Sequence, residues 1–284
     1  MPPIPLRHLQ SRSPEESLAG SFTIRDLKEL MNGKDLHQEV HRHDHYLVLV
    51  LEQGKGEHEI DFIPRQVDDR VVFLMRPGQV HRLSLRAGCK GFLIQFKADF
   101  FFHKNKNSGQ LLRRVAHHAF YQAGEDEFKK LLVPLRSVFA EYNEKQEGYR
   151  EVIKANLAVF FIGLLRLSGG PLIEVKSYVQ GRMDELHTLL EKHLSTHKQV
   201  SAYAEMMHLS PYQLNAITKA SLGKSCSTLI RDEIILEAKR QLLAGSAQVS
   251  EIAWQLGYED VSYFIRFFRK HSGYSPEAFR KKFR

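Results

Sequence analysis

The sequence is poor in cysteine, in tryptophan and in long apolar runs. Its 284 residues include two cysteines and one tryptophan. Cys89 and Cys226 lie far apart and match no metal-ligand spacing, so we expect free thiols in a reducing compartment and no disulfide framework. No early apolar stretch resembles a signal peptide, and no run of about 18 apolar residues could cross a membrane. We therefore expect a cytoplasmic protein with no membrane partner.

Acidic residues are outnumbered by basic ones. The 33 Asp and Glu residues face 41 Lys and Arg residues, which gives a formal net charge of +8. This balance favours a polyanionic partner such as nucleic acid, although a basic surface without a partner would give the same count. After residue 265 only Glu277 opposes a cluster of basic residues, namely Arg266, Arg269, Lys270, Arg280, Lys281, Lys282 and Arg284.

Short strands are predicted for the part of the chain that follows an irregular arm at residues 1–20. Residues 46–51 form a continuous apolar run, which is typical of a strand covered on both faces. Further strands are predicted at 57–63, 70–75, 81–85 and 91–96, with turn residues between them. Such a series indicates a small antiparallel sandwich or barrel, which we place at 21–124.

Helical periodicity begins at residue 125. A helix is predicted over 125–144, interrupted at Pro134, and a second over 150–167. The apolar face of the second helix is wider than one-sided packing needs, so it can pack on the sheet, form a dimer interface, or do both. We interpret 125–168 as a helical dimerisation region and 169–181, which begins with Gly169-Gly170-Pro171, as a linker. The rest, 182–284, reads as all helical from a first helix at 184–197.

One local pattern occurs twice in the last eighty-odd residues. Each copy reads as a short helix, a tight turn and a second helix that ends at glycine, first from Val200 to Gly223 and again from Val249 to Gly273. Ser210 and Asp260 stand where the second helix of each copy needs an N-terminal cap. This outline is a helix-turn-helix, whose second helix enters a DNA major groove.

A long helix is predicted between the two copies. If it extends from Ser225 to Ala244, it is about 30 Å long at about 1.5 Å per residue. Successive major-groove faces on one side of B-DNA lie about 34 Å apart. The connecting helix therefore has the length needed to place two recognition helices in adjacent major grooves. The alternative is an ordinary helical bundle with solvated charges.

The same region carries a family resemblance. Residues 235–243, 249–253, 256–264 and 266–271, followed by Gly273-Tyr-Ser-Pro276 and Phe279-Arg280, resemble the signature of AraC/XylS-type transcriptional regulators over about 100 residues. By this resemblance, the DNA-reading positions are Tyr212, Asn215 and Ala216 in the first copy and Ser262, Tyr263 and Arg266 in the second. The first copy departs from the pattern, since Ala216 stands in place of arginine and Thr218 in place of phenylalanine.

Helix faces extend this set of candidates. Arg266 is a candidate for bidentate contact with guanine, and Arg269 and Lys270 for contacts with phosphate. The complete predicted DNA-binding set is Tyr212, Gln213, Asn215, Ala216, Lys219, Val261, Ser262, Tyr263, Arg266, Arg269 and Lys270.

The N-terminal histidines resemble those of the cupin-type sensor domain that is common in this family. A metal site could combine His43, His45 and His81, but metal-binding cupins have a glutamate three or four residues beyond the paired histidines, where Leu49 and Val50 stand here. We therefore expect no metal, no cofactor and no catalytic residue. The candidates for binding a small organic effector are His43, His45, Tyr46, His81 and Arg82. A purely structural role for the histidines stays open.

These features combine into an α+β protein, with an N-terminal cupin-like antiparallel β-barrel carrying helices and a C-terminal all-α domain of two helix-turn-helix units. The resemblance implies a sequence-specific transcriptional regulator, with activation as the default, that binds promoter or operator DNA. A small-molecule effector, a second copy of the chain and RNA polymerase are the further partners considered. The alternatives are a metal-dependent cupin enzyme and a DNA-binding dimer that needs no ligand.

Overall fold

The computed structural model describes residues 5–9, 21–102, 106–167, 178–244 and 247–283. The chain divides into two compact units, one spanning Pro5–Leu172 and the other containing Ile173–Arg284. Of the predicted arm at 1–20, only 5–9 are described, and most of the predicted linker, at 168–177, lies outside the described residues. Among the described residues, no helix combines the length and the apolar character that crossing a bilayer requires.

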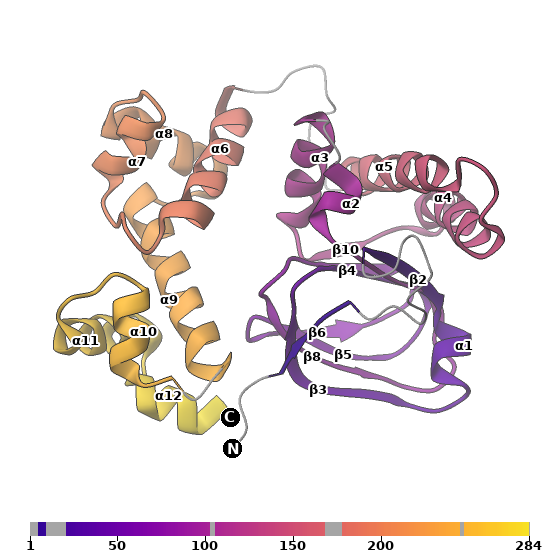
Figure 1. Cartoon of the computed structure of the whole chain (residues 1–284), viewed down its shortest axis with the longest axis horizontal. Helices are drawn as coiled ribbons and strands as arrows, with labels where there is room; N and C mark the ends of the chain where they lie inside the picture. Colours follow the sequence, from indigo (N-terminus) through magenta and orange to yellow (C-terminus); the bar gives the residue numbers. More distant parts are fainter. Residues whose placement is uncertain (1–4, 10–20, 103–105, 168–177, 245–246, 284) are drawn as a thin grey trace. The chain divides into compact units, whose positions relative to one another are not determined.

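Two five-stranded sheets form the N-terminal unit (Figure 1). The first has the order β1-β3-β8-β5-β6 and contains β1 (Leu6–Arg7), β3 (Leu36–His43), β8 (Val80–Leu85), β5 (Gly56–Ile60) and β6 (Ile63–Val67). The second has the order β10-β7-β4-β9-β2 and contains β10 (Phe120–Gln122), β7 (Val71–Met75), β4 (Tyr46–Gln53), β9 (Lys90–Phe96) and β2 (Phe22–Asp26). β1 is parallel to β3, and the other paired strands are antiparallel.

Strand β4 confirms the prediction of a strand covered on both faces. Its alternate residues Leu47, Leu49 and Leu51 belong to the core between the two sheets. Val48 and Val50 face the other way, into a core shared with the helices. Period-two alternation therefore gives one continuous apolar run two different cores.

The predicted strand at 57–63 is wrong in one respect, because two strands occupy this stretch. β5 ends at Ile60 and β6 begins at Ile63. Between them Asp61 and Phe62 have φ values of 48° and 69°, in the left-handed region, so the chain reverses there. The alternating pattern continued through the reversal, and no glycine marked it.

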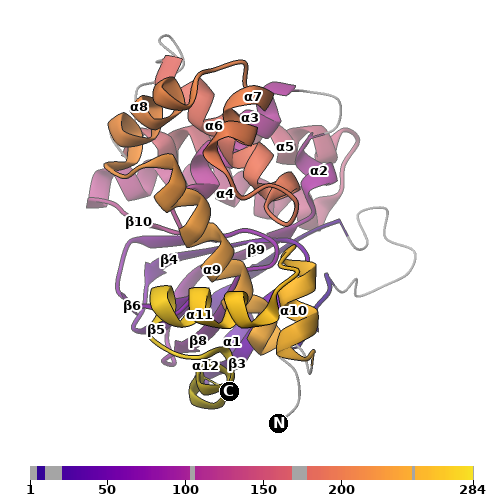
Figure 2. The ribbon, with the colours of Figure 1, turned by 90° about the vertical axis from the view of Figure 1, so that its left-hand side faces the viewer.

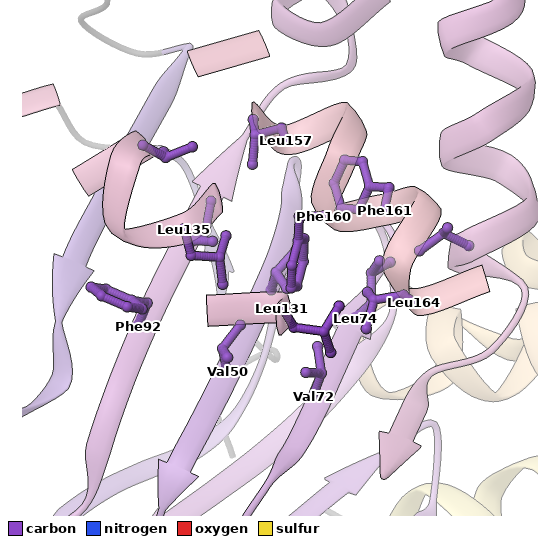
Figure 3. Packing of buried hydrophobic residues seen from close by; sticks show 14 of the residues in the cluster. Val50, Val72, Leu74, Phe92, Leu131, Leu135, Leu157, Phe160, Phe161 and Leu164 are labelled. Carbon is purple, nitrogen blue, oxygen red and sulfur yellow. The ribbon is translucent and has the colours of Figure 1, made fainter. Parts of the chain in front are cut away.

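Among the described residues, five helices, the first two of them short, complete this unit: α1 (Leu27–Met31), α2 (Ala98–Phe102), α3 (Lys106–Ala116), α4 (Glu125–Glu144) and α5 (Tyr149–Leu167). α4 and α5 match the two predicted helices, but α4 runs through Pro134 without interruption, and that proline is buried. Figure 3 shows Leu131, Leu135, Phe160, Phe161 and Leu164 of these helices packed on strand residues that include Val50, Val72 and Leu74. The helices α4 and α5 and the second sheet thus share one core.

Packing against the sheet accounts for most of the wide apolar face of α5. Phe160, Phe161 and Leu164 are fully buried in the shared core. Val152 and Val159 remain 37% and 58% exposed. The helix therefore packs on the unit, and it also retains apolar side chains at the surface.

The C-terminal unit is all helical. Its helices are α6 (Tyr178–His193), α7 (Val200–Met206), α8 (Pro211–Leu222), α9 (Cys226–Ala244), α10 (Val249–Gln255), α11 (Val261–Ser272) and α12 (Pro276–Phe283). α6 begins before the predicted residue 184, inside the stretch expected to be a linker. Figures 1 and 2 show α7 and α8 near one end of α9, and α10, α11 and α12 near the other.

Candidate nucleic-acid interface and buried histidine cluster

The two helix-turn-helix copies share the same turn geometry. In the first, the amide of Leu209 donates to the carbonyl of Ala204 at 2.8 Å, and in the second the amide of Tyr258 donates to that of Ala253 at 2.8 Å. Both alanines are buried, so a larger side chain would separate the helices. The left-handed turn residue is His208 in the first copy and Gly257 in the second. The sequence repeat is therefore a structural repeat.

Caps fix the start of α8 and of α11, the second helix of each copy. Ser210 and Gln213 form a capping box at α8, where each side chain accepts a hydrogen bond from the backbone amide of the other residue. At α11, the Asp260 carboxylate accepts from the amides of Ser262 and Tyr263 at 2.7 and 3.0 Å. Gly223 and Gly273 end the two helices in the left-handed conformation. These contacts confirm the predicted boundaries.

The connecting helix α9 forms the spine of the unit. It has 19 residues, which corresponds to a length of about 28 Å. Ile230, Ile234, Leu242 and Leu243 are among its buried residues, and it packs against α7, α8, α10, α11 and α12. Both α8 and α11 are thus held by one helix (Figure 2).

Most of the predicted DNA-binding side chains lie at the surface. Tyr212 is 84% exposed and Tyr263 is 53% exposed. The exposed members of the set are Tyr212, Gln213, Ala216, Lys219, Ser262, Tyr263, Arg266, Arg269 and Lys270, and the partly buried ones are Asn215 and Val261. Arg266 also lies 3.9 Å from the carboxylate of Asp260, so the cap of α11 faces this guanidinium.

Asn215 differs from the others because both ends of its amide bind the protein. Its Oδ1 accepts from the backbone amide of Cys226 at 2.9 Å, at the start of α9. Its Nδ2 donates to the carbonyl of Pro211 at 3.0 Å. The structure therefore gives Asn215 a role in joining α8 to α9. Thr218 is buried in the same helix, where its hydroxyl donates to the carbonyl of Asn215.

Lys198 joins the segment before the first copy to the second copy and was not identified from the sequence. Its ammonium group donates to the carbonyls of Ser195 at 3.1 Å and Gly257 at 2.7 Å, and it lies 4.8 Å from the centre of the Tyr258 ring. Ser195 precedes α7, whereas Gly257 is in the turn of the second copy. No local sequence pattern links residues 59 positions apart.

Arg280 and Trp254 have positions that the sequence did not indicate. Arg280, part of the basic C-terminal cluster, donates to the carbonyls of Leu242 and Ala247, so it closes the C-terminal end of α9. Trp254 is 61% exposed on α10. A single exposed aromatic residue in a short helix gives no periodic signal by which the sequence could have revealed it.

The five candidate effector residues do not form one site. His43 and His81 are buried and adjacent, with their Nε2 atoms 3.0 Å apart. Tyr46 stacks on Phe96 on the helix-facing side of the sheet. Arg82 is exposed and pairs with Glu59 at 2.8 Å. Side chains that alternate along a strand point to opposite faces, which separates Arg82 from His81.

His45 belongs to a different polar network from His43 and His81. Its Nδ1 lies 2.9 Å from the Asp44 carboxylate, and its Nε2 accepts from the amide of Gln95 at 3.0 Å. Burial works to raise the pKa of Asp44, but hydrogen bonds from His8 and His45 outweigh it and lower the pKa to about 2. The sequence-based metal trio of His43, His45 and His81 is therefore wrong, because both ring nitrogens of His45 are engaged elsewhere.

His41 takes the third place beside His43 and His81. The three Nε2 atoms lie 3.1 Å (His41 to His43), 3.0 Å (His43 to His81) and 2.9 Å (His81 to His41) apart. His58 adds a fourth imidazole, with its Nε2 3.0 Å from Nδ1 of His81. We call these four residues the histidine cluster; all are buried.

A β-bulge in β3 creates this arrangement. Gln38 pairs with Leu83 but His41 pairs with His81, so β3 has one extra residue between the two pairs. A one-residue shift exchanges the two faces of a strand. Accordingly the odd-numbered His37 and Glu39, before the bulge, are exposed. His41 and His43, after the bulge, are also odd-numbered but are buried. Strand alternation alone could not predict this change.

Burial determines the protonation of the cluster. Desolvation lowers the pKa of His41 to about 4 and that of His43 to about 3, and it also lowers the pKa of His81. These imidazoles are therefore neutral near pH 7. Neutral imidazole is the form that binds a metal ion.

Comparisons with known proteins agree with both units. An AraC-like ligand binding domain family matches residues 31–161, and a helix-turn-helix domain family matches residues 203–282. The chain is 22% identical over 247 residues to the HTH-type transcriptional activator RhaS of Escherichia fergusonii, covering 85% of this chain and 87% of that protein. The chain is also 22% identical over 242 residues to RhaS of Salmonella paratyphi B, again covering 85% of this chain and 87% of that protein.

Solved structures are similar over the whole chain or its C-terminal part. The match to fatty-acid-bound ToxT from Vibrio cholerae spans 92% of this chain and 95% of the ToxT chain, with a TM-score of 0.45 and 15% identity. The match to the C-terminal domain of the response regulator yesN from Fusobacterium nucleatum spans 35% of this chain and 98% of that domain, with a TM-score of 0.33 and 27% identity. With a ligand-binding domain family matching its N-terminal unit and a helix-turn-helix family its C-terminal unit, the chain belongs to the AraC family of transcriptional regulators.

Proposed function

We propose that this protein is a sequence-specific regulator of transcription that binds promoter DNA through α8 and α11. The observation that carries the proposal is the attachment of two capped, outward-facing helices to one spine, α9. A spine of about 28 Å suits two helices that enter major grooves about 34 Å apart. The exposed basic groups of Lys219, Arg269 and Lys270 provide contacts with phosphate.

The two copies differ in the contacts they offer. In α11, Arg266 extends from an exposed surface, and a bidentate arginine can identify guanine. In α8, Ala216 can read a thymine methyl group only, and the amide of Asn215 is occupied within the protein. We infer that α11 provides the stronger specific anchor, while α8 adds a weaker contact through Tyr212 and Gln213.

The proposal extends to regulation by a small-molecule effector held in the N-terminal unit. RhaS is named an activator, and we propose that this protein also activates transcription of its target genes. Effector binding would change the population of states that bind adjacent half-sites. We also propose a homodimer, a contact with RNA polymerase and a cytoplasmic location. The exposed Val152 and Val159 of α5 support a dimer surface, since apolar side chains in water gain by being covered.

Selection of bound DNA from a random library tests the main proposal. The full-length protein should enrich sequences with two conserved blocks about one helical turn apart. Affinity for an enriched site should fall steeply with added salt, because each neutralised phosphate releases counterions. If no sequence is enriched and the protein binds all duplexes equally, sequence-specific regulation is contradicted.

Catalysis is the competing function for the N-terminal unit, and we propose that the protein is not an enzyme. This interpretation rests on the attached DNA-binding unit, whose surface residues the cupin chemistry would not need.

Sedimentation of the free and DNA-bound protein tests the dimer separately. A monomer in both states would leave DNA recognition intact and remove the dimer from the proposal.

A further inference from the structure

We propose that the N-terminal unit binds one transition-metal ion through the Nε2 atoms of His41, His43 and His81. The three residues come from two neighbouring strands, β3 and β8, and their rings point to one centre. This proposal goes beyond regulation of transcription and does not depend on it. Two of the three residues, His43 and His81, were also candidates for effector binding, and His41 completes the group.

The distances fit a shared ion. Imidazole nitrogens bind zinc and similar ions at about 2.0–2.1 Å. Two such ligands lie about 2.9 Å apart when they subtend about 90° at the ion, and about 3.3 Å apart at the tetrahedral angle. The observed separations of 2.9, 3.0 and 3.1 Å match the smaller angle. The trio therefore resembles three adjacent positions of an octahedral or five-coordinate site.

Hydrogen bonding among the three rings cannot explain this convergence. Each Nε2 either carries a proton or presents a lone pair, so three mutually close nitrogens cannot all form hydrogen bonds with one another. Nδ1 of His41 lies 2.7 Å from the carbonyl oxygen of Glu39, which can only accept. That contact fixes the proton on Nδ1 and directs a lone pair of the neutral ring from Nε2 to the centre. A cation would satisfy all three nitrogens at once.

His58 is placed to orient His81. Its Nε2 lies 3.0 Å from Nδ1 of His81, on the side of the ring that faces away from the trio. If His81 donates a proton there, its Nε2 also presents a lone pair to the centre. Metal-binding histidines usually donate the proton of their second ring nitrogen to a carboxylate, a carbonyl oxygen or water, which holds the ring in the required orientation, and here His58 would be the acceptor. His58 itself packs edge-on to Phe73, 4.6 Å away, which limits its movement.

The donor set determines the class of ion. Among the described residues, the group of possible ligands around this centre contains three imidazoles and no carboxylate or thiolate. Imidazole suits zinc, iron, cobalt, nickel and copper, whereas magnesium and calcium require oxygen ligands. With neutral ligands the ion retains its full charge, so solvent or an anionic molecule would complete its coordination.

Direct metal binding by the full-length protein without a histidine tag tests the proposal. The protein is stripped with a chelator, and Zn²⁺ and Co²⁺ are then titrated in separate experiments. The expected result is one ion per chain, with X-ray absorption of the zinc-loaded protein showing imidazole scattering from about three ligands near 2.0–2.1 Å. This measurement uses the unmodified protein, so it does not depend on whether a variant folds.

A pair of variants on the same strand then locates the ion. His43→Gln should lower zinc affinity by at least about 100-fold, because it removes a direct ligand, whereas His37→Gln, which changes an exposed histidine of β3, should not change it. Circular dichroism establishes that both variants are folded. The proposal would be overturned by the absence of stoichiometric binding, by absorption spectra without imidazole scattering, or by equal affinity in folded His43→Gln and wild type.

Discussion

The ammonium group of Lys198 lies 2.7 Å from the carbonyl oxygen of Gly257, and this contact joins the segment before the first helix-turn-helix copy to the turn of the second. The approach is close enough that a Cβ atom on Gly257 would collide with the carbonyl oxygen of Ser195. Gly257 also has a φ of 73°. The orientation of the two recognition helices thus depends on a position where only glycine fits.

Gly257→Ala should destabilise the C-terminal unit more than the same change at Gly273. Both glycines have positive φ values, which cost alanine about 1–2 kcal/mol, but nothing lies within 4 Å of a Cβ at Gly273. The collision at Gly257 should add at least about 1 kcal/mol, in the range of an overpacked site. Urea unfolding of the two variants measures the difference. Equal losses would show that the segment carrying Ser195 moves away freely.

Arg266→Ala and Lys270→Ala should weaken DNA binding in different ways. Loss of Arg266 should remove about 1–3 kcal/mol of discrimination at one base pair and leave binding to unrelated DNA nearly unchanged. Loss of Lys270 should weaken binding to all sequences and reduce the slope of log K against log salt by about 1. Fluorescence anisotropy with the selected site and a mismatched site measures both. If the two variants behave alike, the separate roles are wrong.

Asn215→Ala should lower stability rather than alter the preferred DNA sequence. The change removes the acceptor that caps α9 at Cys226, and loss of a helix cap costs about 0.5–2 kcal/mol. Asn215→Asp retains an oxygen acceptor and should lose less. Thermal unfolding and repeated library selection test the two effects. A changed consensus with unchanged stability would return Asn215 to the DNA-reading set.

The metal-free protein should lose stability as the pH falls below about 6.5. In the unfolded chain His41 and His43 take up protons near that pH, whereas in the folded state their pKa values are about 4 and about 3. Their folded pKa values are lowered, so the unfolded state binds more protons and is favoured by acid. Each histidine should contribute a slope of up to about 1.4 kcal/mol per pH unit until its folded pKa is reached. Urea unfolding between pH 7 and pH 4.5 measures the slope, and His43→Gln should reduce it.

Local patterns predicted much of this fold. The run at 46–51 identified β4, and helical spacing identified α4, α5, α8 and α11 within a few residues. Caps at Ser210 and Asp260 were predictable because they depend on neighbours only three residues away. These elements owe their form to interactions that are local along the chain.

Sequence reasoning failed where distant segments meet. Three contacts join residues that are distant along the chain. Lys198 donates to the carbonyl of Gly257, Arg280 donates to the carbonyl of Leu242 at the end of α9, and the side chain of Asn215 accepts from the amide of Cys226. The reversal at Asp61 and Phe62 carried no glycine, and Pro134 did not end its helix. Among the histidines, His45 and not His41 was named from the sequence, because nothing local to the chain indicates the bulge in β3 that turns His41 inward.

That bulge has a consequence for how the N-terminal unit can change. If the bulge closed without any change in sequence, β3 would shift by one residue along β8, and His41 and His43 would turn to the solvent with Val40 and Arg42 in their places. Every histidine would still be in the chain. The side chains that meet between the sheets are therefore governed by the register of one strand pair as well as by the residues that the strand contains.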